Sequence, residues 1–169
     1  MGDPREIGQL SPYPCTSLEL CERFATSLER RRMLDGFLRF RERLGQFALS
    51  TGFQWLDGSF LEDIEAIEAR APGDLDIVTF YTPTTIDLNT RLRAGFPEFW
   101  DRNLSKRDFG LDHFPVDMGH NPFLTVEMAR YWSSLFSHRR DRVWKGMLRI
   151  DLNTPLEDIK AREHLTKLV

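Results

Sequence analysis

Two short stretches decide how this chain is expected to fold: Leu56-Asp57-Gly58-Ser59-Phe60 and Gly73-Asp74-Leu75-Asp76-Ile77-Val78. The first closes the apolar run that starts at Phe53 with a Gly-Ser turn, which predicts a buried strand followed by a tight turn. The second places two carboxylates two residues apart at the start of a β-rich apolar run. Because alternate side chains of a strand share a face, Asp74 and Asp76 are expected to point the same way.

A third stretch, Phe114-Pro115-Val116-Asp117-Met118, places a further carboxylate inside an apolar segment. Three acidic side chains that converge on one point are what hard divalent cations such as Mg²⁺ or Mn²⁺ require. We therefore predict that Asp74, Asp76 and Asp117 bind the metal and form the catalytic site. Asp112 is a rival for the third position, but it precedes the predicted strand and is expected to be exposed.

Each part of this predicted site also has a structural interpretation. Asp74 and Asp76 would then lie at a solvated strand end and merely terminate it. Asp117 would form a salt bridge with a nearby cation, since a buried lone carboxylate is costly. Gly58-Ser59 would be an ordinary strand-to-helix turn.

Candidate phosphate ligands lie on both sides of the carboxylates in the sequence. The Gly58-Ser59 turn can bring backbone N–H groups and a hydroxyl to a phosphate. A basic segment over 138–149 lies further along, and a basic patch opposite an acidic metal site would suit a triphosphate. Positive residues near a helix C-terminus are also favourable without any ligand. The predicted nucleotide-binding residues are Gly58, Ser59, Arg139, Arg140 and Lys145.

The 169-residue chain is long enough for one domain with a sizeable core, and 41% hydrophobic with 29% charged residues is usual for a globular protein. Its net charge of −3 supplies no global basic field for nucleic acid. No apolar run has membrane-spanning length, the N-terminus lacks a secretory pattern, and Cys15 and Cys21 fit no zinc or redox motif. We therefore expect a cytoplasmic protein with no membrane partner.

Hydrophobic spacing and turn residues predict helices first, and then strands interleaved with helices. The expected helices cover about 17–26, 28–48, 86–101, 122–137 and 154–168, and the expected strands about 53–57, 74–81, 113–118 and 142–152. This order favours an α+β fold in which a small mixed β-sheet is flanked by helices, with the N-terminal helices packed on it. The single domain expected over 1–169 divides into a helical part (1–50), an active-site core (53–118) and a C-terminal helix–strand–helix part (122–169).

The order of these motifs resembles the nucleotidyltransferase fold of the DNA polymerase beta type. That superfamily shows an apolar residue followed by Gly and then Gly or Ser, an Asp-x-Asp pair within an apolar strand, and a third carboxylate on a later strand. Here fourteen residues separate Ser59 from the Asp-x-Asp pair. More closely, Trp55–Phe60 with Gly73–Asp76 resembles a bacterial family of uncharacterised nucleotidyltransferase-like proteins, and so do Ser11–Phe40 and Tyr131–Met147.

The resemblance implies that Asp74, Asp76 and Asp117 hold one or two Mg²⁺ ions, while Gly58 and Ser59 hold the β and γ phosphates of an NTP. The implied reaction moves an NMP from the NTP to a hydroxyl of a protein, an RNA or a small molecule.

One departure from the pattern favours a different function. Minimal nucleotidyltransferases often carry a basic residue just after the Gly-Ser-Phe, whereas Leu61, Glu62 and Asp63 follow here. Acids beside a triphosphate are unfavourable unless they point away. The alternative is a catalytically inactive binding or regulatory protein with this fold, such as one half of a toxin–antitoxin or phage-defence pair. A third interpretation is a structural interaction module whose acidic cluster is incidental.

Overall fold

The computed structural model describes residues 3, 5–6, 9–139 and 141–168. The helices are α1 (Ser17–Phe24), α2 (Leu28–Gln46), α3 (Ile64–Glu68), α4 (Leu88–Gly95), α5 (Arg102–Phe109), α6 (Pro122–Phe136) and α7 (Pro155–Lys167). The strands are β1 (Tyr13–Pro14), β2 (Gly52–Asp57), β3 (Leu75–Tyr81), β4 (Leu111–Asp117) and β5 (Leu148–Asp151), and the 3₁₀ turns are η2 (Ser59–Leu61) and η3 (Pro97–Phe99). None of the described helices has the length and hydrophobicity to cross a membrane.

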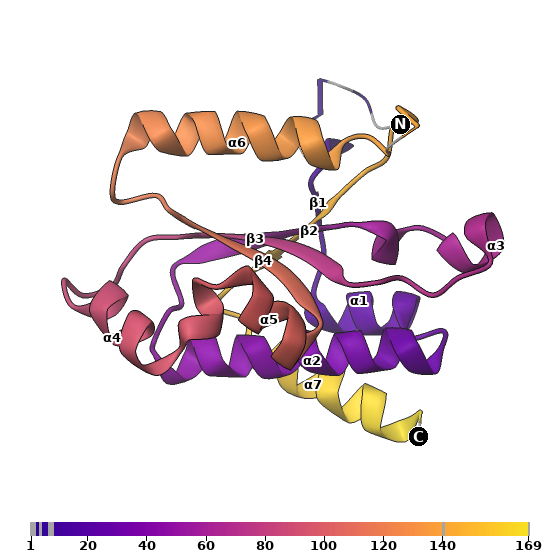
Figure 1. Cartoon of the computed structure of the whole chain (residues 1–169), viewed down its shortest axis with the longest axis horizontal. Coiled ribbons are helices and arrows are strands. Elements are labelled where there is room, and N and C mark those ends of the chain that lie inside the picture. The colour runs from indigo at the N-terminus through magenta and orange to yellow at the C-terminus, as the bar shows by residue number, and fades with distance from the viewer. Residues whose placement is uncertain (1–2, 4, 7–8, 140, 169) are drawn as a thin grey trace.

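In the described residues the strands form a five-stranded sheet in the order β1-β5-β2-β3-β4 (Figure 1). The strand β2 runs antiparallel to both of its neighbours, β3 and β5. The pairs β3–β4 and β1–β5 are parallel. The protein is therefore α+β with a small mixed sheet, which confirms the fold class predicted from the sequence.

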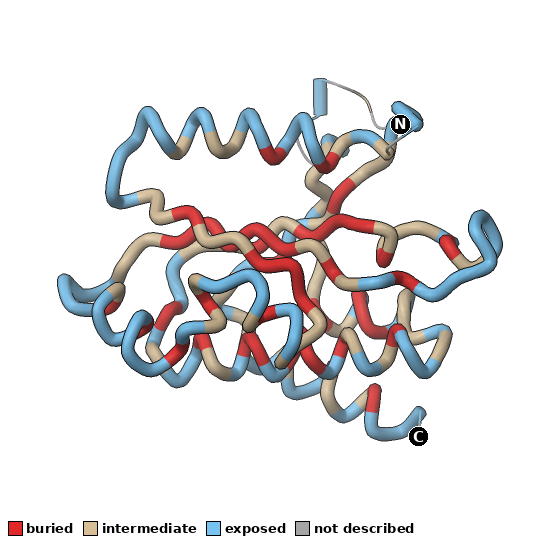
Figure 2. Tube along the Cα trace, in the orientation of Figure 1, coloured by how far each residue is buried: buried red, intermediate tan, exposed pale blue. Residues whose placement is uncertain are grey.

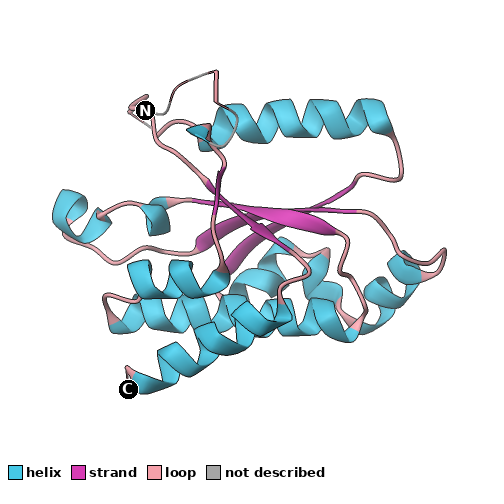
Figure 3. Cartoon of the chain, turned by 180° about the vertical axis from the view of Figure 1, so that it is seen from behind, coloured by secondary structure: helices cyan, strands magenta, loops and turns pink. Residues whose placement is uncertain are grey.

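Helices cover the two faces of the sheet unequally. The helix α6 runs along one face, whereas α1, α2, α5 and α7 lie on the other (Figures 1 and 3). The helix-rich side holds the larger core, in which Leu56 and Ile77 of the sheet pack with Phe37 of α2. The α6 side holds a smaller cluster that includes Val78 and Trp132. Figure 2 shows the buried positions running along the strands and along the helix surfaces turned toward them.

Some predicted boundaries were wrong. Residues 86–101 form α4 and then η3 rather than one helix, because Pro97 has no backbone N–H to continue the helical ladder. The helix α5 was not predicted, and β4 begins at Leu111 rather than at His113. The last strand is restricted to β5, because residues 137–139 and 141–147 lie outside it, with His138 and Trp144 paired through an isolated bridge.

A chain of buried polar side chains crosses the helix-rich face of the sheet. Arg41 of α2 donates to Gln54 Oε1 at 2.7 Å, and Gln54 Nε2 donates to Thr79 Oγ1 at 3.1 Å. The Thr79 hydroxyl lies 2.8 Å from His113 Nε2, and His113 Nδ1 lies 3.1 Å from the Phe99 carbonyl oxygen. Burial lowers the pKa of His113 to about 3, so the ring is neutral and Nε2 can accept from Thr79 while Nδ1–H donates. This chain links three adjacent strands to α2.

We expect Thr79→Val to lower the free energy of unfolding by about 1–3 kcal/mol, because Gln54 and His113 each lose a buried partner while the side-chain volume is kept. Urea denaturation measures the change. The control is Thr51→Val at an exposed position before β2, where a change within about 0.5 kcal/mol is expected. Equal losses of unfolding free energy in the two variants would contradict a stabilising role for the Thr79 hydroxyl in this chain of buried polar side chains.

Candidate functional site

Three carboxylates lie side by side where β2, β3 and β4 pair. The register sets Asp57 of β2 opposite Asp76 of β3, and Asp76 opposite Asp112 of β4. Directly paired residues of neighbouring strands share a face, and Val78 places this face on the α6 side. We call these three residues the acidic row. Asp74 lines the same pocket as the row, so the predicted pair of Asp74 and Asp76 is joined by two further carboxylates.

The structure does not bring Asp117 to this cluster, which corrects its predicted role as the third ligand. Asp117 pairs with Tyr81, five residues along the strands from the Asp76–Asp112 pair, or about 16 Å of extended chain. An odd separation along a strand also turns the side chain to the other face. The Asp117 carboxylate accepts a hydrogen bond from Asn89 Nδ2 at 2.8 Å, which is a structural role at the far end of β4.

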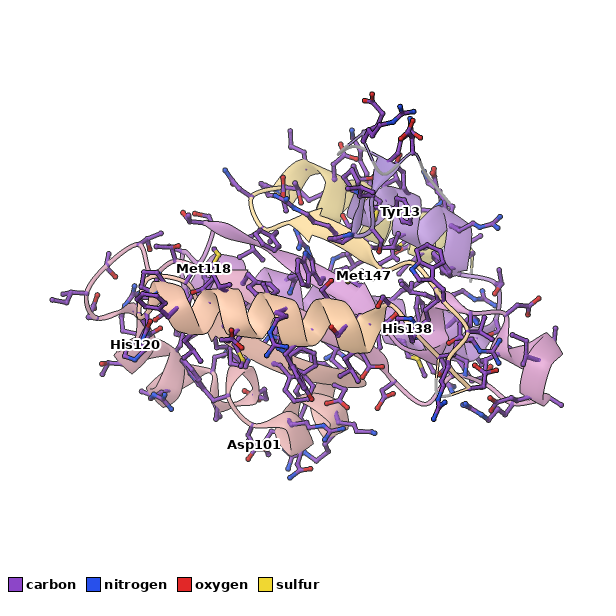
Figure 4. All side chains as sticks on the ribbon, turned by 90° about the horizontal axis from the view of Figure 1, so that it is seen from above. Tyr13, Asp101, Met118, His120, His138 and Met147 are labelled. Atoms are coloured by element: carbon purple, nitrogen blue, oxygen red, sulfur yellow. The ribbon has the colours of Figure 1, made fainter. Side chains whose placement is uncertain are left out.

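The residues that follow Asp117 and a residue that lines the pocket of the acidic row lie at opposite ends of α6 (Figure 4). Met118 and His120, which follow Asp117, lie beyond the N-terminal end of the helix, whereas His138 lies beyond its C-terminal end. His138 lines the same pocket as the acidic row. Asp112, rather than Asp117, lies beside Asp76 in the sheet.

Protein cations neutralise most of the cluster. Lys145 Nζ lies 3.0 Å from Asp57 Oδ2, and Lys106 Nζ lies 2.5 Å from Asp74 Oδ2. Arg102 binds both carboxylate oxygens of Asp112. Within the described part of the chain, Asp76 is the member of the cluster that has no ion-pair partner.

The electrostatics of the cluster disfavour full ionisation. Burial, together with the charges of Asp74, Asp112 and Asp57, raises the pKa of Asp76 to about 7. Burial also raises the pKa of Asp57 to about 6, although Lys145 opposes the rise. Asp57 is only 4% exposed, and its Oδ1 atom has no hydrogen-bond partner among the described residues. The pocket therefore holds carboxylate oxygens whose interactions are incomplete, which is where an added cation would be favourable.

Gly58 allows the Asp76 carboxylate to approach the end of β2. Its φ of +90° lies in the region that glycine tolerates and that L side chains rarely adopt. A Cβ atom at this position would lie 2.1 Å from Asp76 Oδ2. Ser59, the first residue of η2, lines the same pocket. The predicted Gly-Ser turn and the predicted Asp-x-Asp pair are thus in direct contact through Gly58 and Asp76.

The pocket around the acidic row has a volume of about 760 Å³. Two of the predicted basic residues, Arg139 and Lys145, line it, whereas Arg140 lies outside the described residues. The sequence analysis missed Arg102 and Lys106, which also line the pocket. They stand four residues apart in α5, a spacing that places both on one helix face, but no helix was predicted there.

The buried side chain of Arg30 fixes the loop that carries the Gly-Ser turn. Its Nη1 and Nη2 donate to the carbonyl oxygens of Phe60 and Glu62 at 2.6 Å each. Nε and Nη2 also reach the two carboxylate oxygens of Glu65 at 2.7 Å. Arg30 thereby connects α2 to the backbone just after Ser59, so its role is to position this loop.

The donor chemistry of the pocket fits a hard divalent cation, since carboxylate oxygens are the ligands that Mg²⁺ and Mn²⁺ prefer. In the described residues, however, no three acidic, histidine or cysteine side chains are grouped as a ready metal site. Lys106 and Arg102 hold the carboxylates of Asp74 and Asp112. Metal binding at the Asp74–Asp76–Asp112 set would require these two cations to move aside, while Asp76 is already without an ion pair.

Comparison with known proteins identifies the family but not an activity. No curated protein and no solved structure matches the chain. The model of a family of unknown function, DUF6932, matches residues 3–151, which cover most of the chain and include the acidic row, the Gly-Ser turn and Lys145. The chain therefore belongs to the DUF6932 family.

Proposed function

We propose that this protein is a metal-dependent nucleotidyltransferase that moves an NMP from an NTP to a hydroxyl acceptor. The observation that carries the proposal is the placement of Asp112 directly beside Asp76, next to the Gly58–Ser59 turn. This gives the Asp-x-Asp pair a third carboxylate on a neighbouring strand and a glycine turn at the same pocket. The resemblance to the DNA polymerase beta superfamily, with Asp112 in place of Asp117, supports the same function.

The carboxylates, the glycine turn and three of the cations of the pocket would have separate roles in this reaction. Asp74, Asp76 and Asp112 would hold one or two Mg²⁺ or Mn²⁺ ions, which supply Lewis-acid activation of the acceptor hydroxyl and charge stabilisation of the leaving pyrophosphate. The backbone of Gly58 and the hydroxyl of Ser59 would bind the phosphates of the NTP. Arg139, Lys145 and Lys106 would contribute positive charge to the same pocket. The acceptor class is a hydroxyl of a protein, an RNA or a small molecule.

A second candidate function is an inactive member of the same fold that binds a partner and regulates it. The observation that favours it is that Lys145, Lys106 and Arg102 form ion pairs with Asp57, Asp74 and Asp112. A cluster that satisfies most of its charges internally can persist as a structural network. The two functions differ in their dependence on Asp76, which this network leaves without an ion pair.

The test of the proposed function is transfer of label from each α-labelled NTP to an acceptor in a cell lysate with Mg²⁺, with release of pyrophosphate. We expect Asp76→Asn and Asp112→Asn each to lower transfer by about a thousandfold or more, because several kcal/mol of metal-assisted stabilisation would be lost. Asp117→Asn is the matched control, as it removes a carboxylate from the same strand but from the far end of the sheet. It should keep transfer within a few-fold of wild type, provided that circular dichroism shows the fold intact.

Two results would contradict the proposal. Loss of transfer in Asp117→Asn equal to that in Asp112→Asn, with the fold intact, would contradict the assigned metal ligands. Wild-type protein that binds NTP but labels nothing with any of the four nucleotides would favour the inactive, regulatory function instead.

A further inference from the structure

The described residues 137–139 and 141–147, here called the basic loop, carry two cations into the pocket. Its backbone is closed by hydrogen bonds from the Arg139 N–H to the Val143 carbonyl at 2.8 Å and from the Lys145 N–H to the Ser137 carbonyl at 2.9 Å. The side chains of Arg139 and Lys145 are 25% and 14% exposed, so both are partly withdrawn from solvent. The loop is thus held in a shape that presents both cations to the end of the sheet.

One carboxylate bridges these two cations. Glu62 Oε2 lies 3.2 Å from Arg139 Nε, and Glu62 Oε1 lies 3.3 Å from Lys145 Nζ. Lys145 Nζ also lies 3.4 Å from the Gly58 carbonyl oxygen, so this cation stands directly beside the glycine turn. The Glu62 side chain is 15% exposed and lines the pocket.

The neighbouring acid behaves differently, which singles out Glu62. Asp63 caps α3, since its side chain accepts a hydrogen bond from the Ala66 N–H. Asp63 is exposed and does not line the pocket. Of the two acids that follow Gly-Ser-Phe-Leu, only Glu62 therefore points to the place where a phosphate would lie against the turn.

We infer that Arg139 and Lys145 form an anion subsite for the terminal phosphates of a polyphosphate ligand, and that the Glu62 carboxylate occupies this subsite until the ligand displaces it. The inference rests on the proposed function, because an NTP is the polyphosphate that the pocket is proposed to bind. It accounts for an acid at a position where a triphosphate binder would be expected to carry a neutral or basic residue. Arg139 also pairs with Asp141 at 3.2 Å and Lys145 with Asp57 at 3.0 Å, so Glu62 is the carboxylate that the two cations share. A phosphate group can take over both of the Glu62 contacts while the other two pairs remain.

The displacement has a measurable cost in affinity. A ligand phosphate must compete with a carboxylate that is already held by both cations, so binding of the ligand is weaker than the cations alone would allow. Replacement of Glu62 by its neutral isostere removes this competitor and leaves Arg139 and Lys145 in place. Affinity for a polyphosphate should then rise by about tenfold, the effect of one partly buried charge contact.

The test is the binding of inorganic tripolyphosphate to the full chain in a metal-free buffer, measured by isothermal titration calorimetry. Glu62→Gln should bind tripolyphosphate about tenfold more tightly than wild type. Glu68→Gln is the matched control, since Glu68 lines the same pocket but pairs with Arg70 at 2.6 Å, so the pocket loses the same charge without freeing the basic loop. Its affinity should stay within about twofold of wild type. The double variant Glu62→Gln/Arg139→Gln should lose the gain.

The outcomes separate this inference from the proposed function. Equal tightening in Glu62→Gln and Glu68→Gln would reduce the effect to the net charge of the pocket and overturn the inference. So would unchanged or undetectable tripolyphosphate binding in Glu62→Gln. In each of these cases, wild-type binding of an NTP with Mg²⁺ leaves the proposed function standing. If wild type and Glu62→Gln bind neither tripolyphosphate nor any NTP with Mg²⁺, both proposals fall.

Discussion

Replacement of Arg30 by Met should lower the free energy of unfolding by about 3–5 kcal/mol, because a buried, fully paired cation is lost and its partners are left unsatisfied. The Arg30 side chain is 4% exposed, and its guanidinium binds two backbone carbonyls and the Glu65 carboxylate. It also lies over the Phe60 ring, with 5.2 Å from Cζ to the ring centroid. Urea denaturation at neutral pH measures the loss.

The same substitution should disturb the Gly-Ser turn more than the rest of the fold. The two carbonyls that Arg30 holds belong to Phe60 and Glu62, which directly follow the turn. We therefore expect faster amide hydrogen exchange over residues 58–62 in Arg30→Met, even where the variant remains folded. Arg30→Lys should recover only part of the stability, because an ammonium group cannot make the forked contacts of a guanidinium.

The control is Arg39→Met on the same helix. Arg39 is 47% exposed and pairs with Asp35 one turn away, so its loss should cost at most about 1 kcal/mol. If Arg30→Met cost no more than Arg39→Met, the buried network would not be what holds this loop.

Local patterns in the sequence predicted the fold class and two of the motifs that meet at the pocket. Hydrophobic spacing and turn residues predicted α2 and α6, and the β-rich apolar run after Gly73 predicted β3, because these signals depend on neighbours in the chain. The Gly-Ser turn and the Asp-x-Asp pair were also local patterns, and the structure brings Gly58 against Asp76.

The rest of the site depends on strand register, which a single sequence does not state. The start of β4 was misplaced by two residues, and this error moved Asp112 out of the predicted strand and left Asp117 as the third carboxylate. Asp57 was predicted only as the last residue of a buried strand, and the β2–β3 register sets it opposite Asp76. A one-residue change in register reverses the face of every side chain, so these partners follow from pairing across the sheet rather than from spacing along it.

Asp76→Asn should make the metal-free protein more stable at pH 8, which is the opposite of the usual effect of removing a site residue. The pKa of Asp76 is raised from 3.8 to about 7 in the folded protein. At a pH between 3.8 and about 7, Asp76 keeps its proton in the folded protein, whereas the same carboxyl group has released it in the unfolded chain. The contribution of Asp76 to the free energy of unfolding therefore falls as the pH rises from about 4 to 7, and the fall is complete above the pKa of the folded state.

The amide of Asn cannot ionise, so Asp76→Asn should lack this component of the pH dependence. At about 1.4 kcal/mol per pKa unit the rise sets a ceiling of about 4 kcal/mol, and partial solvent contact reduces the expected gain at pH 8 to about 2–3 kcal/mol. Urea denaturation of both proteins at pH 4, 6 and 8 should show curves that converge at pH 4 and separate as the pH rises. Under the proposed function, Mg²⁺ at pH 8 should stabilise wild type by mass action and leave the variant unchanged, because the ion compensates the charge that Asp76 carries. A variant less stable than wild type at pH 8 would mean that ionised Asp76 is already satisfied within the protein, and the main reason to place a cation in this pocket would be gone.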